Sequence, residues 1–538
     1  MARTLFFALH ALALLGLYAA GLDSLLTWVL FLALLGTFAL GLADLAQTEH
    51  SLRRNFPLFA RARWLAEHLR PFVRQYLLES DMDGAPINRM FRSIVYQRAK
   101  GDLDTVPFGT RVDTYREGYE WIGHSIAALN LDDLDRDPRV RIGGPDCARP
   151  YDAPILNISA MSFGALSANA VRALNKGARL GGFYQNTGEG GLSDYHRAYG
   201  GDLTWQIGTG YFGCRNPDGS FSPERFADTA AQDAVRMIEV KLSQGAKPGH
   251  GGILPASKND DIIARIRGVE PRTEVVSPSA HTAFDSPRGL LEFIARLRTL
   301  AGGKPVGFKL CVGRQSEFIA ICKAMVETGI KPDFITVDGG EGGTGAAPLE
   351  YSNSVGMPLR DGLAFVVDCL IGFGLRDDIR VIASGKLITA FHLAKALALG
   401  ADLCNSARGM MLALGCVQSL VCNTNRCPTG VTTQDPRLTR GLDVEDKGER
   451  VARYQHETVH ALLDIVSSAG LRAPGELNRS HIYRRVDPER VARYDALYPY
   501  PGVGDFLRHP VRGPYAPYIE EANSDCFLPR SYVFAGEA

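Results

Sequence analysis

The sequence predicts an α/β protein whose main part is a (β/α)8 TIM barrel, preceded by an N-terminal two-helix transmembrane hairpin. Three observations lead to this prediction. Short apolar runs alternate with amphipathic helical patterns from about residue 154 onward, glycine-rich loops follow many of these runs, and two long apolar runs lie within residues 4–42. Alternating strands and helices favour a parallel sheet, and eight such strands favour closure into a barrel.

The N-terminal apolar runs cover residues 4–20 and 25–42, each close to the length that a helix needs to cross hydrocarbon. Only residues 21–24 separate them, which suits a tight hairpin. Arg3 precedes the pair and Arg53, Arg54, Arg61 and Arg63 follow it. Positive charge at both outer ends predicts that both face the cytoplasm, with the hairpin in the inner membrane. The alternative is a signal peptide cleaved near Ala20, which the second apolar run argues against.

We divide the chain into a hairpin (1–45), a basic connector with an N-terminal lead-in segment (46–150), the barrel (151–470) and a C-terminal tail (471–538). Within the connector, residues 53–76 form an amphipathic basic pattern. Such a segment either lies on anionic lipid or packs as a simple connector helix on the main domain.

Each predicted barrel strand is a short apolar run that ends at a loop. The predicted strands are 155–161, 183–187, 204–207, 238–242, 306–311, 334–337, 381–383 and 403–405. The predicted helices include 168–180, 223–237, 317–328, 359–371, 390–399 and 444–471.

Overall composition excludes some functions. Lys plus Arg and Asp plus Glu both total 59, so the net charge is zero and no basic field points to nucleic acid. The ten cysteines are scattered and do not form a disulfide framework, which predicts a reducing compartment.

In barrels of this type the chemistry sits in loops that follow the carboxyl ends of the strands. Small residues after the first strand let a flat ring approach the backbone, and the last two loops are the usual phosphate site. The candidate cofactor-binding residues in these places are Ala160, Met161, Ser162, Gln206, Lys309, Gly342, Gly343, Gly345, Gly385, Arg408 and Gly409.

Charged residues at strand ends suggest a division of roles. Lys309 ends the fifth strand, where a cation beside the N1–C2 edge of a flavin would stabilise the reduced anionic ring. Lys241 and Glu189 would face the exposed side of the ring, where a substrate carboxylate and amino or imino group would sit. The alternative for each lysine is a structural ion pair inside the barrel.

Three cysteines follow the barrel strands at C-x5-C-x4-C spacing, namely Cys416, Cys422 and Cys427. Thiolates so close in one loop suit iron or zinc. Three thiolates indicate a three-iron cluster, an open site or a distant fourth ligand. The alternative is a buried loop whose cysteines pack as small hydrophobic residues.

Ordered motifs in this region resemble the FMN-binding synthase domain of glutamate synthase over about residues 150–470. They are ISAMSFGA from Ile158, NTGEGG from Asn186, QGAKPG from Gln244, GGTGA from Gly342 and CPTGVTTQ from Cys427. The resemblance implies bound FMN and a 3Fe-4S cluster on the three cysteines. It also implies reduction of 2-iminoglutarate, made from 2-oxoglutarate and ammonia, to glutamate.

The expected protein is therefore a membrane-anchored flavin and iron–sulfur oxidoreductase with Glu189 and Lys241 as catalytic residues. No GxGxxG nicotinamide fingerprint follows a strand, so the electron donor is expected to be ferredoxin-like, a reductase subunit or a membrane carrier. Two alternatives are an FMN oxidoreductase acting on another amine or 2-oxo acid, and a non-catalytic electron-transfer subunit at the membrane.

Overall fold

The computed structural model describes residues 2–528. The chain forms two compact units, Met1–Met90 and Phe91–Ala538.

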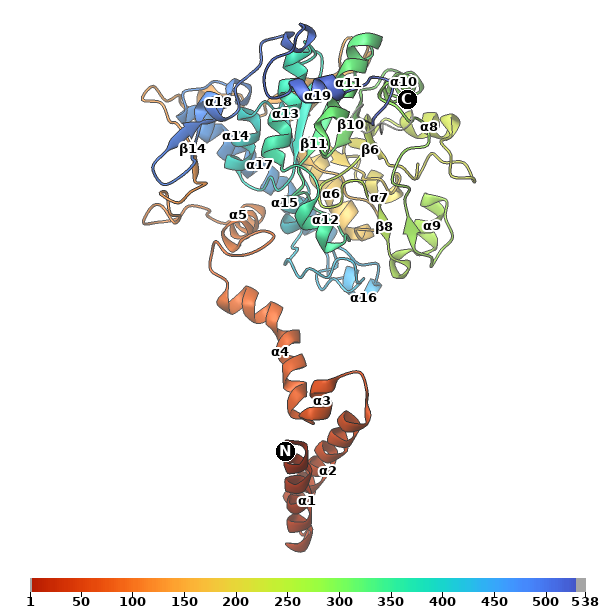
Figure 1. Cartoon of the computed structure of the whole chain (residues 1–538), viewed down its shortest axis with the longest axis vertical. Coiled ribbons are helices and arrows are strands. Elements are labelled where there is room, and N and C mark those ends of the chain that lie inside the picture. Colours follow the sequence, from red (N-terminus) through yellow and green to blue (C-terminus); the bar gives the residue numbers. More distant parts are fainter. Residues whose placement is uncertain (1, 529–538) are drawn as a thin grey trace. The chain divides into compact units, whose positions relative to one another are not determined.

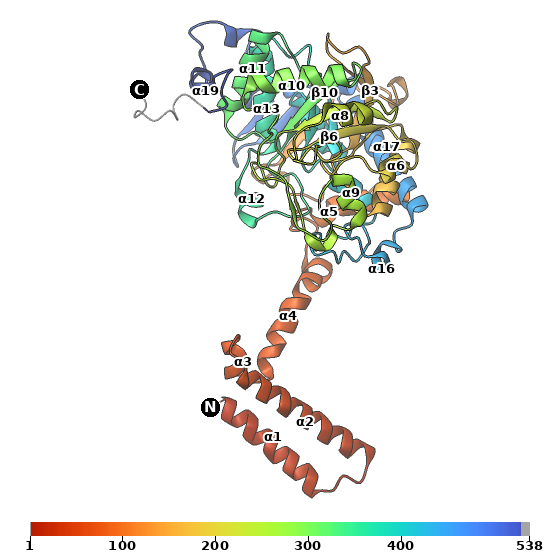
Figure 2. The ribbon, with the colours of Figure 1, turned by 90° about the vertical axis from the view of Figure 1, so that its right-hand side faces the viewer.

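The first unit begins with two antiparallel helices, α1 (Ala2–Ala19) and α2 (Leu25–Ala46), which lie side by side (Figure 2). Ser24 begins α2, because its side chain accepts a hydrogen bond from the backbone N–H of Thr27. Phe7 and Phe38 hold the pair together with an edge-to-face contact at 5.4 Å between ring centroids. The shorter α3 (Ser51–Asn55), α4 (Phe59–Val73) and η1 (Arg74–Leu78) complete the unit.

Among the described residues, α2 is the helix long and apolar enough to cross a membrane, with a mean hydropathy of 2.3 over 18 residues. The apolar helix at Arg3–Ala19 is shorter. Both predicted apolar runs are therefore helical, and a hairpin in which both helices cross the membrane stays a prediction.

The second unit is built around a closed barrel of parallel strands (Figure 1). Each predicted strand is present, and each is buried almost throughout because it is covered on both faces. The strands are β4 (Leu156–Ile158), β5 (Gln185–Asn186), β6 (Leu203–Ile207), β7 (Val235–Lys241), β10 (Val306–Leu310), β11 (Phe334–Asp338), β12 (Arg380–Ser384) and β13 (Leu403–Ser406). Pairing of β13 with β4 closes the ring. The predicted (β/α)8 barrel is confirmed.

Helices cover the outside of the barrel. They are α6 (Ala168–Gly181), α8 (Pro223–Ala230), α10 (Pro287–Leu300), α11 (Gln315–Thr328), α13 (Leu359–Gly372), α14 (Ala390–Ala398) and α17 (Val444–Ser468). The prediction of one helix over 223–237 is wrong at its C-terminal end. From Val235 the chain is strand β7, where exposed Arg236 stands between buried Val235 and Met237, as the two-residue period of a strand requires.

The loop after β7 is a long insertion that carries its own small elements. They are β8 (Ile253–Leu254), η3 (Ala256–Lys258), α9 (Asp261–Arg267) and β9 (Val275–Val276). Further short elements are α5 (Arg89–Lys100), β1 (Glu120–Ile122), η2 (Leu131–Asp133), β2 (Arg139–Ile142), β3 (Tyr151–Pro154), α7 (Asp194–Arg197), α12 (Leu349–Ser354), α15 (Arg408–Ala413) and α16 (Pro436–Thr439).

The described part of the C-terminal tail packs on the barrel unit. Its elements are η4 (Pro474–Glu476), η5 (Arg479–His481), β14 (Ile482–Arg485), β15 (Val491–Arg493), α18 (Tyr494–Leu497), η6 (Asp505–Leu507) and α19 (Ala516–Glu521). Strand β14 pairs with β1. Fully buried Arg479 forms an ion pair with Asp368 of α13.

Candidate active site

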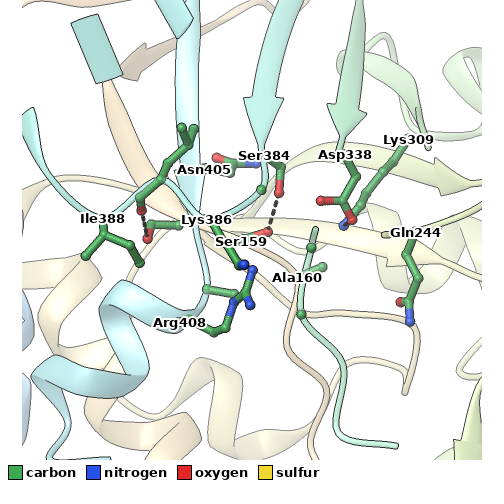
Figure 3. Close-up of a pocket in the computed structure, with 16 residues that line it drawn as sticks. Ser159, Ala160, Gln244, Lys309, Asp338, Ser384, Lys386, Ile388, Asn405 and Arg408 are labelled. Atoms are coloured by element: carbon green, nitrogen blue, oxygen red, sulfur yellow. Dashed lines mark hydrogen bonds and ion pairs between the residues drawn. The ribbon is translucent and has the colours of Figure 1, made fainter. Parts of the chain in front are cut away.

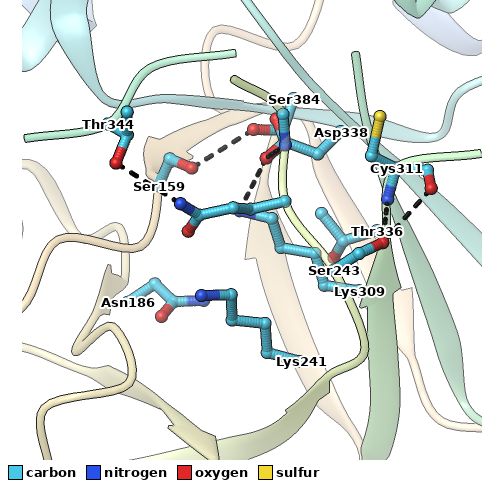
Figure 4. A network of polar contacts seen from close by, with 12 residues as sticks. Ser159, Asn186, Lys241, Ser243, Lys309, Cys311, Thr336, Asp338, Thr344 and Ser384 are labelled. Atoms are coloured by element: carbon cyan, nitrogen blue, oxygen red, sulfur yellow. Dashed lines mark hydrogen bonds and ion pairs between the residues drawn. The ribbon is translucent and has the colours of Figure 1, made fainter. Parts of the chain in front are cut away.

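Two lysines stand side by side at the carboxyl end of the barrel. Lys241 of β7 and Lys309 of β10 are paired in register on neighbouring strands (Figure 4). Each has its own carboxylate: Lys241 Nζ lies 2.8 Å from Glu189 Oε1, and Lys309 Nζ lies 3.1 Å from Asp338 Oδ2. The structure thus brings the predicted pair of Glu189 and Lys241 together.

A third buried carboxylate, Glu239 of β7, lies deeper in the barrel. It accepts hydrogen bonds from Asn186 Nδ2 (2.8 Å), Gln206 Nε2 (2.7 Å) and Thr336 Oγ1 (2.6 Å). These bonds compensate for its loss of hydration. The predicted residue Gln206 therefore orients Glu239 in the barrel interior.

Glu189 is surrounded by positive charge. Burial alone would raise the pKa of its carboxyl, but the charge and hydrogen bond of Lys241, with the charges of Lys247 and Arg267, hold the pKa below its usual range. The side chain lies so close to Gly208 and Gly252 that a Cβ on either would collide with it. Glycine at these two positions is what lets the carboxylate occupy this place.

Lys247 and Arg267 come from the insertion after β7, and both are buried. Lys247 Nζ donates a hydrogen bond to Ala346 O at 3.0 Å, and burial lowers its pKa to about 8. Arg267 Nη2 donates to Phe163 O at 3.2 Å, while its buried Nε lacks a partner within the described chain. Burial also lowers the Arg267 pKa to about 10. With Lys241, three buried cations act on the Glu189 carboxylate, and among the described residues neither Lys247 nor Arg267 forms an ion pair of its own.

A histidine from the same insertion positions the Lys241 backbone. The Tyr211 hydroxyl accepts the backbone N–H groups of Thr282 and Ala283, so its own proton is donated to His281 Nδ1. The other ring nitrogen of His281 then carries a proton and donates it to Lys241 O at 2.9 Å. Burial lowers the His281 pKa to about 4, which keeps this neutral tautomer.

A cavity opens beside Lys309 at the ends of the barrel strands (Figure 3). It encloses about 410 Å³, part of it open to solvent. Residues predicted to bind the cofactor line it, namely Ala160, Lys309, Gly342, Gly343, Gly385 and Arg408. Ser159, Ser384, Lys386 and Asn405 contribute further polar groups.

The other predicted cofactor-binding residues do not line this cavity. Met161 and Ser162 lie in the loop after β4, where the backbone of Gly188 approaches Ser162 so closely that a Cβ would stand 2.6 Å from the Ser162 nitrogen. Gly409 packs against Tyr454, and Gly345 lies in open space.

The lining fits FMN. Lys386 and Arg408 lie together on one side in the loops that follow β12 and β13, which is the usual phosphate site of a barrel. Lys309 and Asp338 lie on the other side, beside Gln244 (Figure 3). The small residues Ala160, Gly342 and Gly343 leave backbone open to a flat ring.

The cysteine loop has suitable donors, but its thiols are not arranged as a metal centre. Within residues 2–528, no group of three or more His, Cys, Asp or Glu side chains has the arrangement of a metal site. The loop is nevertheless unusual, since Gln418, Leu420 and Asn425 all have positive φ, a conformation unfavourable for residues other than glycine. Three soft sulfur ligands in such a tightly turned loop suit an iron–sulfur cluster, which stays a prediction.

Several site residues were not predicted from the sequence. Asp338 ends a buried strand as Lys309 does, so the pattern that singled out Lys309 also marks it. Lys247 lies in the QGAKPG motif, which gave a local signal. Arg267 is the last residue of an ordinary amphipathic helix, and nothing in its local sequence distinguishes it.

A parallel barrel whose mouth holds paired lysines and carboxylates beside a cation-lined cavity is the arrangement of an enzyme of the barrel class. Comparison with known proteins identifies the class further. Residues 131–472 match the family model described as the conserved region in glutamate synthase. The chain belongs to the glutamate synthase family and is an oxidoreductase of the glutamate-synthase-like kind.

Two relatives illustrate the range of similarity. A glutamate synthase large subunit-like protein, YerD, of Bacillus subtilis is 38% identical over 492 residues, covering 84% of this chain and 93% of that protein. An archaeal-type glutamate synthase [NADPH] of Thermotoga maritima is 31% identical over 434 residues, covering 79% and 81%. Among solved structures, a mandelate oxidase variant aligns over 68% of this chain and 88% of its own with a TM-score of 0.41 and 16% identity, too little to inform the site.

Proposed function

We propose that the protein is a membrane-anchored FMN and iron–sulfur oxidoreductase that reduces 2-iminoglutarate, formed from 2-oxoglutarate and ammonia, to glutamate. The observation that carries this proposal is the set of three buried cations around the Glu189 carboxylate. A buried cation without its own ion pair, such as Lys247 or Arg267, is costly unless an anion compensates it. A dicarboxylic acid supplies two negative charges in one molecule, and the family of the chain makes 2-oxoglutarate the first candidate.

The residues of the chain have separable tasks in this reaction. Lys247 and Arg267 bind the two substrate carboxylates, because both are buried, act on Glu189, and form no ion pair of their own among the described residues. Glu189 stays ionised and accepts a hydrogen bond from the imino nitrogen, which keeps that nitrogen protonated and its carbon electrophilic. Lys241 holds Glu189 in place through the 2.8 Å contact. When bound, FMN would supply hydride to the imino carbon, and a cluster on the cysteine loop would supply electrons to the flavin.

The cofactors would be held by different parts of the barrel unit. Lys386 and Arg408 would bind the phosphate of FMN, and the Lys309 ammonium would stand beside the ring. Cys416, Cys422 and Cys427 would hold a 3Fe-4S cluster. Electrons would come from a separate donor, either a ferredoxin-like protein, a reductase subunit or a carrier in the membrane.

The membrane is part of the same proposal. The apolar helices α1 and α2 would form a hairpin in the inner membrane, with both ends and the barrel in the cytoplasm. Support comes from the mean hydropathy of α2 and from its exposure, since 6% of its most apolar 18-residue window is buried.

The test is glutamate synthesis by the purified full chain in detergent. Chemically reduced viologen dye replaces the donor, and 2-oxoglutarate with ammonium chloride provides the substrate. We expect glutamate to form, Glu189→Gln and Arg267→Met to abolish it, and Glu445→Gln, an exposed acid on α17, to leave it unchanged. Flavin that is reduced by the dye but is not reoxidised by 2-oxoglutarate with ammonium would rule out this substrate.

A further inference from the structure

Helix α4 has an apolar stripe that no other described part of the first unit covers. Leu65, Leu69, Phe72 and Tyr76 recur at intervals of four, three and four residues, so they lie on one side of the helical segment. Their exposed fractions are 60%, 45%, 55% and 56%. A continuous row of large, half-exposed apolar side chains indicates an interaction surface.

The polar side of the helical segment is mostly positive. Arg61 flanks the stripe, and Arg63, Arg70 and Arg74 lie on the opposite side of the helix. Glu67 is the acidic residue among positions 59–78, and it lies 3.7 Å from Arg70. A helix with an apolar stripe and a basic polar side is typical of helices that lie in the headgroup region of anionic membranes.

An ion pair with a buried carboxylate joins α4 to the end of the candidate membrane helix. Asp44 of α2 is 1% exposed and accepts two hydrogen bonds from Arg61, at 2.9 and 2.7 Å. It also accepts the backbone N–H of Leu58 at 3.1 Å. Leu58 has φ of 64°, a conformation that leucine adopts only when its surroundings impose it. The turn between α2 and α4 is therefore set by specific contacts.

Aromatic contacts strengthen the same corner. The rings of Trp64 in α4 and His50 are in tilted contact with 5.1 Å between their centroids, and the Arg53 guanidinium lies 4.7 Å from the centre of the Trp64 ring. Figure 2 shows that the axis of α4 lies at a large angle to the axis of α2 and does not continue it. If α2 crosses the bilayer, a helix fixed across its cytoplasmic end runs along the membrane surface.

We propose that α4 lies flat on the cytoplasmic surface of an anionic membrane, with its apolar stripe in the lipid and its arginines among the headgroups. This proposal extends the membrane anchoring proposed above and rests on it. It favours lipid over a second protein copy, because the segment follows a candidate membrane helix and the polar side of the segment is basic.

The experiment uses the full chain reconstituted in vesicles of phosphatidylcholine with phosphatidylglycerol, and in vesicles of phosphatidylcholine alone. Hydrogen–deuterium exchange of residues 59–78 reports whether the helix is held on the surface. We expect exchange about tenfold slower on the anionic vesicles, because lipid burial of the stripe suppresses fraying. The variant Leu69→Gln with Phe72→Gln should lose this protection. The matched control, Glu67→Gln with His68→Gln in the same turns, should keep it.

Equal exchange on both kinds of vesicle, or equal effects of the stripe variant and its control, would overturn the proposal. Protection that depends on protein concentration instead of lipid would assign the stripe to a second copy and would overturn it as well. Washing the vesicles at alkaline pH tests separately whether the hairpin is inserted in the membrane, since a protein with an inserted hairpin stays with the vesicles. If alkali releases the protein, α4 should still bind anionic vesicles through the stripe, and absence of such binding would refute the role of α4 too.

Discussion

The Lys309–Asp338 pair offers the sharpest test of how the mouth of the barrel is built. The two side chains are 5% and 6% exposed, and their charged atoms lie 3.1 Å apart. At that separation and with an effective dielectric constant of ~20, the attraction is about 5 kcal/mol. The change Lys309→Met leaves the Asp338 carboxylate buried without its cation, although the backbone N–H of Gly245 still donates a hydrogen bond to it. We therefore expect the free energy of unfolding to fall by about 3–5 kcal/mol.

A double-mutant cycle isolates the pair. Asp338→Asn removes the carboxylate charge that Lys309→Met leaves unpaired. The variant with both changes should therefore be more stable than Lys309→Met alone, with a coupling energy of about 1–3 kcal/mol. Unfolding in guanidinium can be followed by tryptophan fluorescence in a variant that keeps only Trp205, which is fully buried in β6. The matched control is Arg490→Met, which breaks a solvent-exposed pair with Asp487 at 2.6 Å and should cost far less than Lys309→Met. The reasoning would be refuted if the effects of the two single changes on the free energy of unfolding simply added. It would also be refuted if Lys309→Met and Arg490→Met lowered that free energy equally.

Three further predictions concern the cavity and the substrate side. Arg408→Gln should weaken FMN binding about 10- to 100-fold, because it removes one charged hydrogen bond to the phosphate. The affinity is measured by flavin fluorescence on dilution. The control Arg376→Gln breaks an ion pair with Asp402 away from the cavity and should not weaken FMN binding. The KM for 2-oxoglutarate should rise as the pH passes about 8, because Lys247 is charged below its pKa and neutral above it. Lys247→Arg should remove that rise in KM. A rise that persists in this variant would exclude Lys247 as its source. Tyr211→Phe should lower the free energy of unfolding by about 1–3 kcal/mol, since it leaves two part-buried backbone N–H groups and the buried His281 Nδ1 without their partner. An unchanged value would contradict the hydrogen bonds assigned to the Tyr211 hydroxyl.

The barrel itself could be predicted from local sequence. Its strands are short apolar runs between loops, and burial on both faces makes such runs stand out. The boundary of β7 was missed because the segment from Val235 to Met237 follows a true helix without an intervening glycine or proline, and its two-residue period spans few residues. Period alone separates helix from strand poorly over so short a stretch.

The site was predictable where it depends on strand ends and unpredictable where it depends on the insertion. Strand ends converge at one edge of a barrel, so the sequence alone assigns Lys241, Lys309 and Arg408 to one mouth. Arg267 reaches Glu189 from a helix in the insertion after β7, and its position follows from packing that local sequence does not encode.

The cofactor content of the purified protein tests the central claim most directly. Optical and electron paramagnetic resonance spectra of the detergent-solubilised full chain, with iron analysis, report flavin and cluster together. We expect visible flavin bands, release of FMN on denaturation, and a paramagnetic signal in the oxidised state that is absent from Cys416→Ala and present in Cys526→Ala. A colourless preparation without iron, obtained from protein that was inserted in the membrane during expression, would contradict the account.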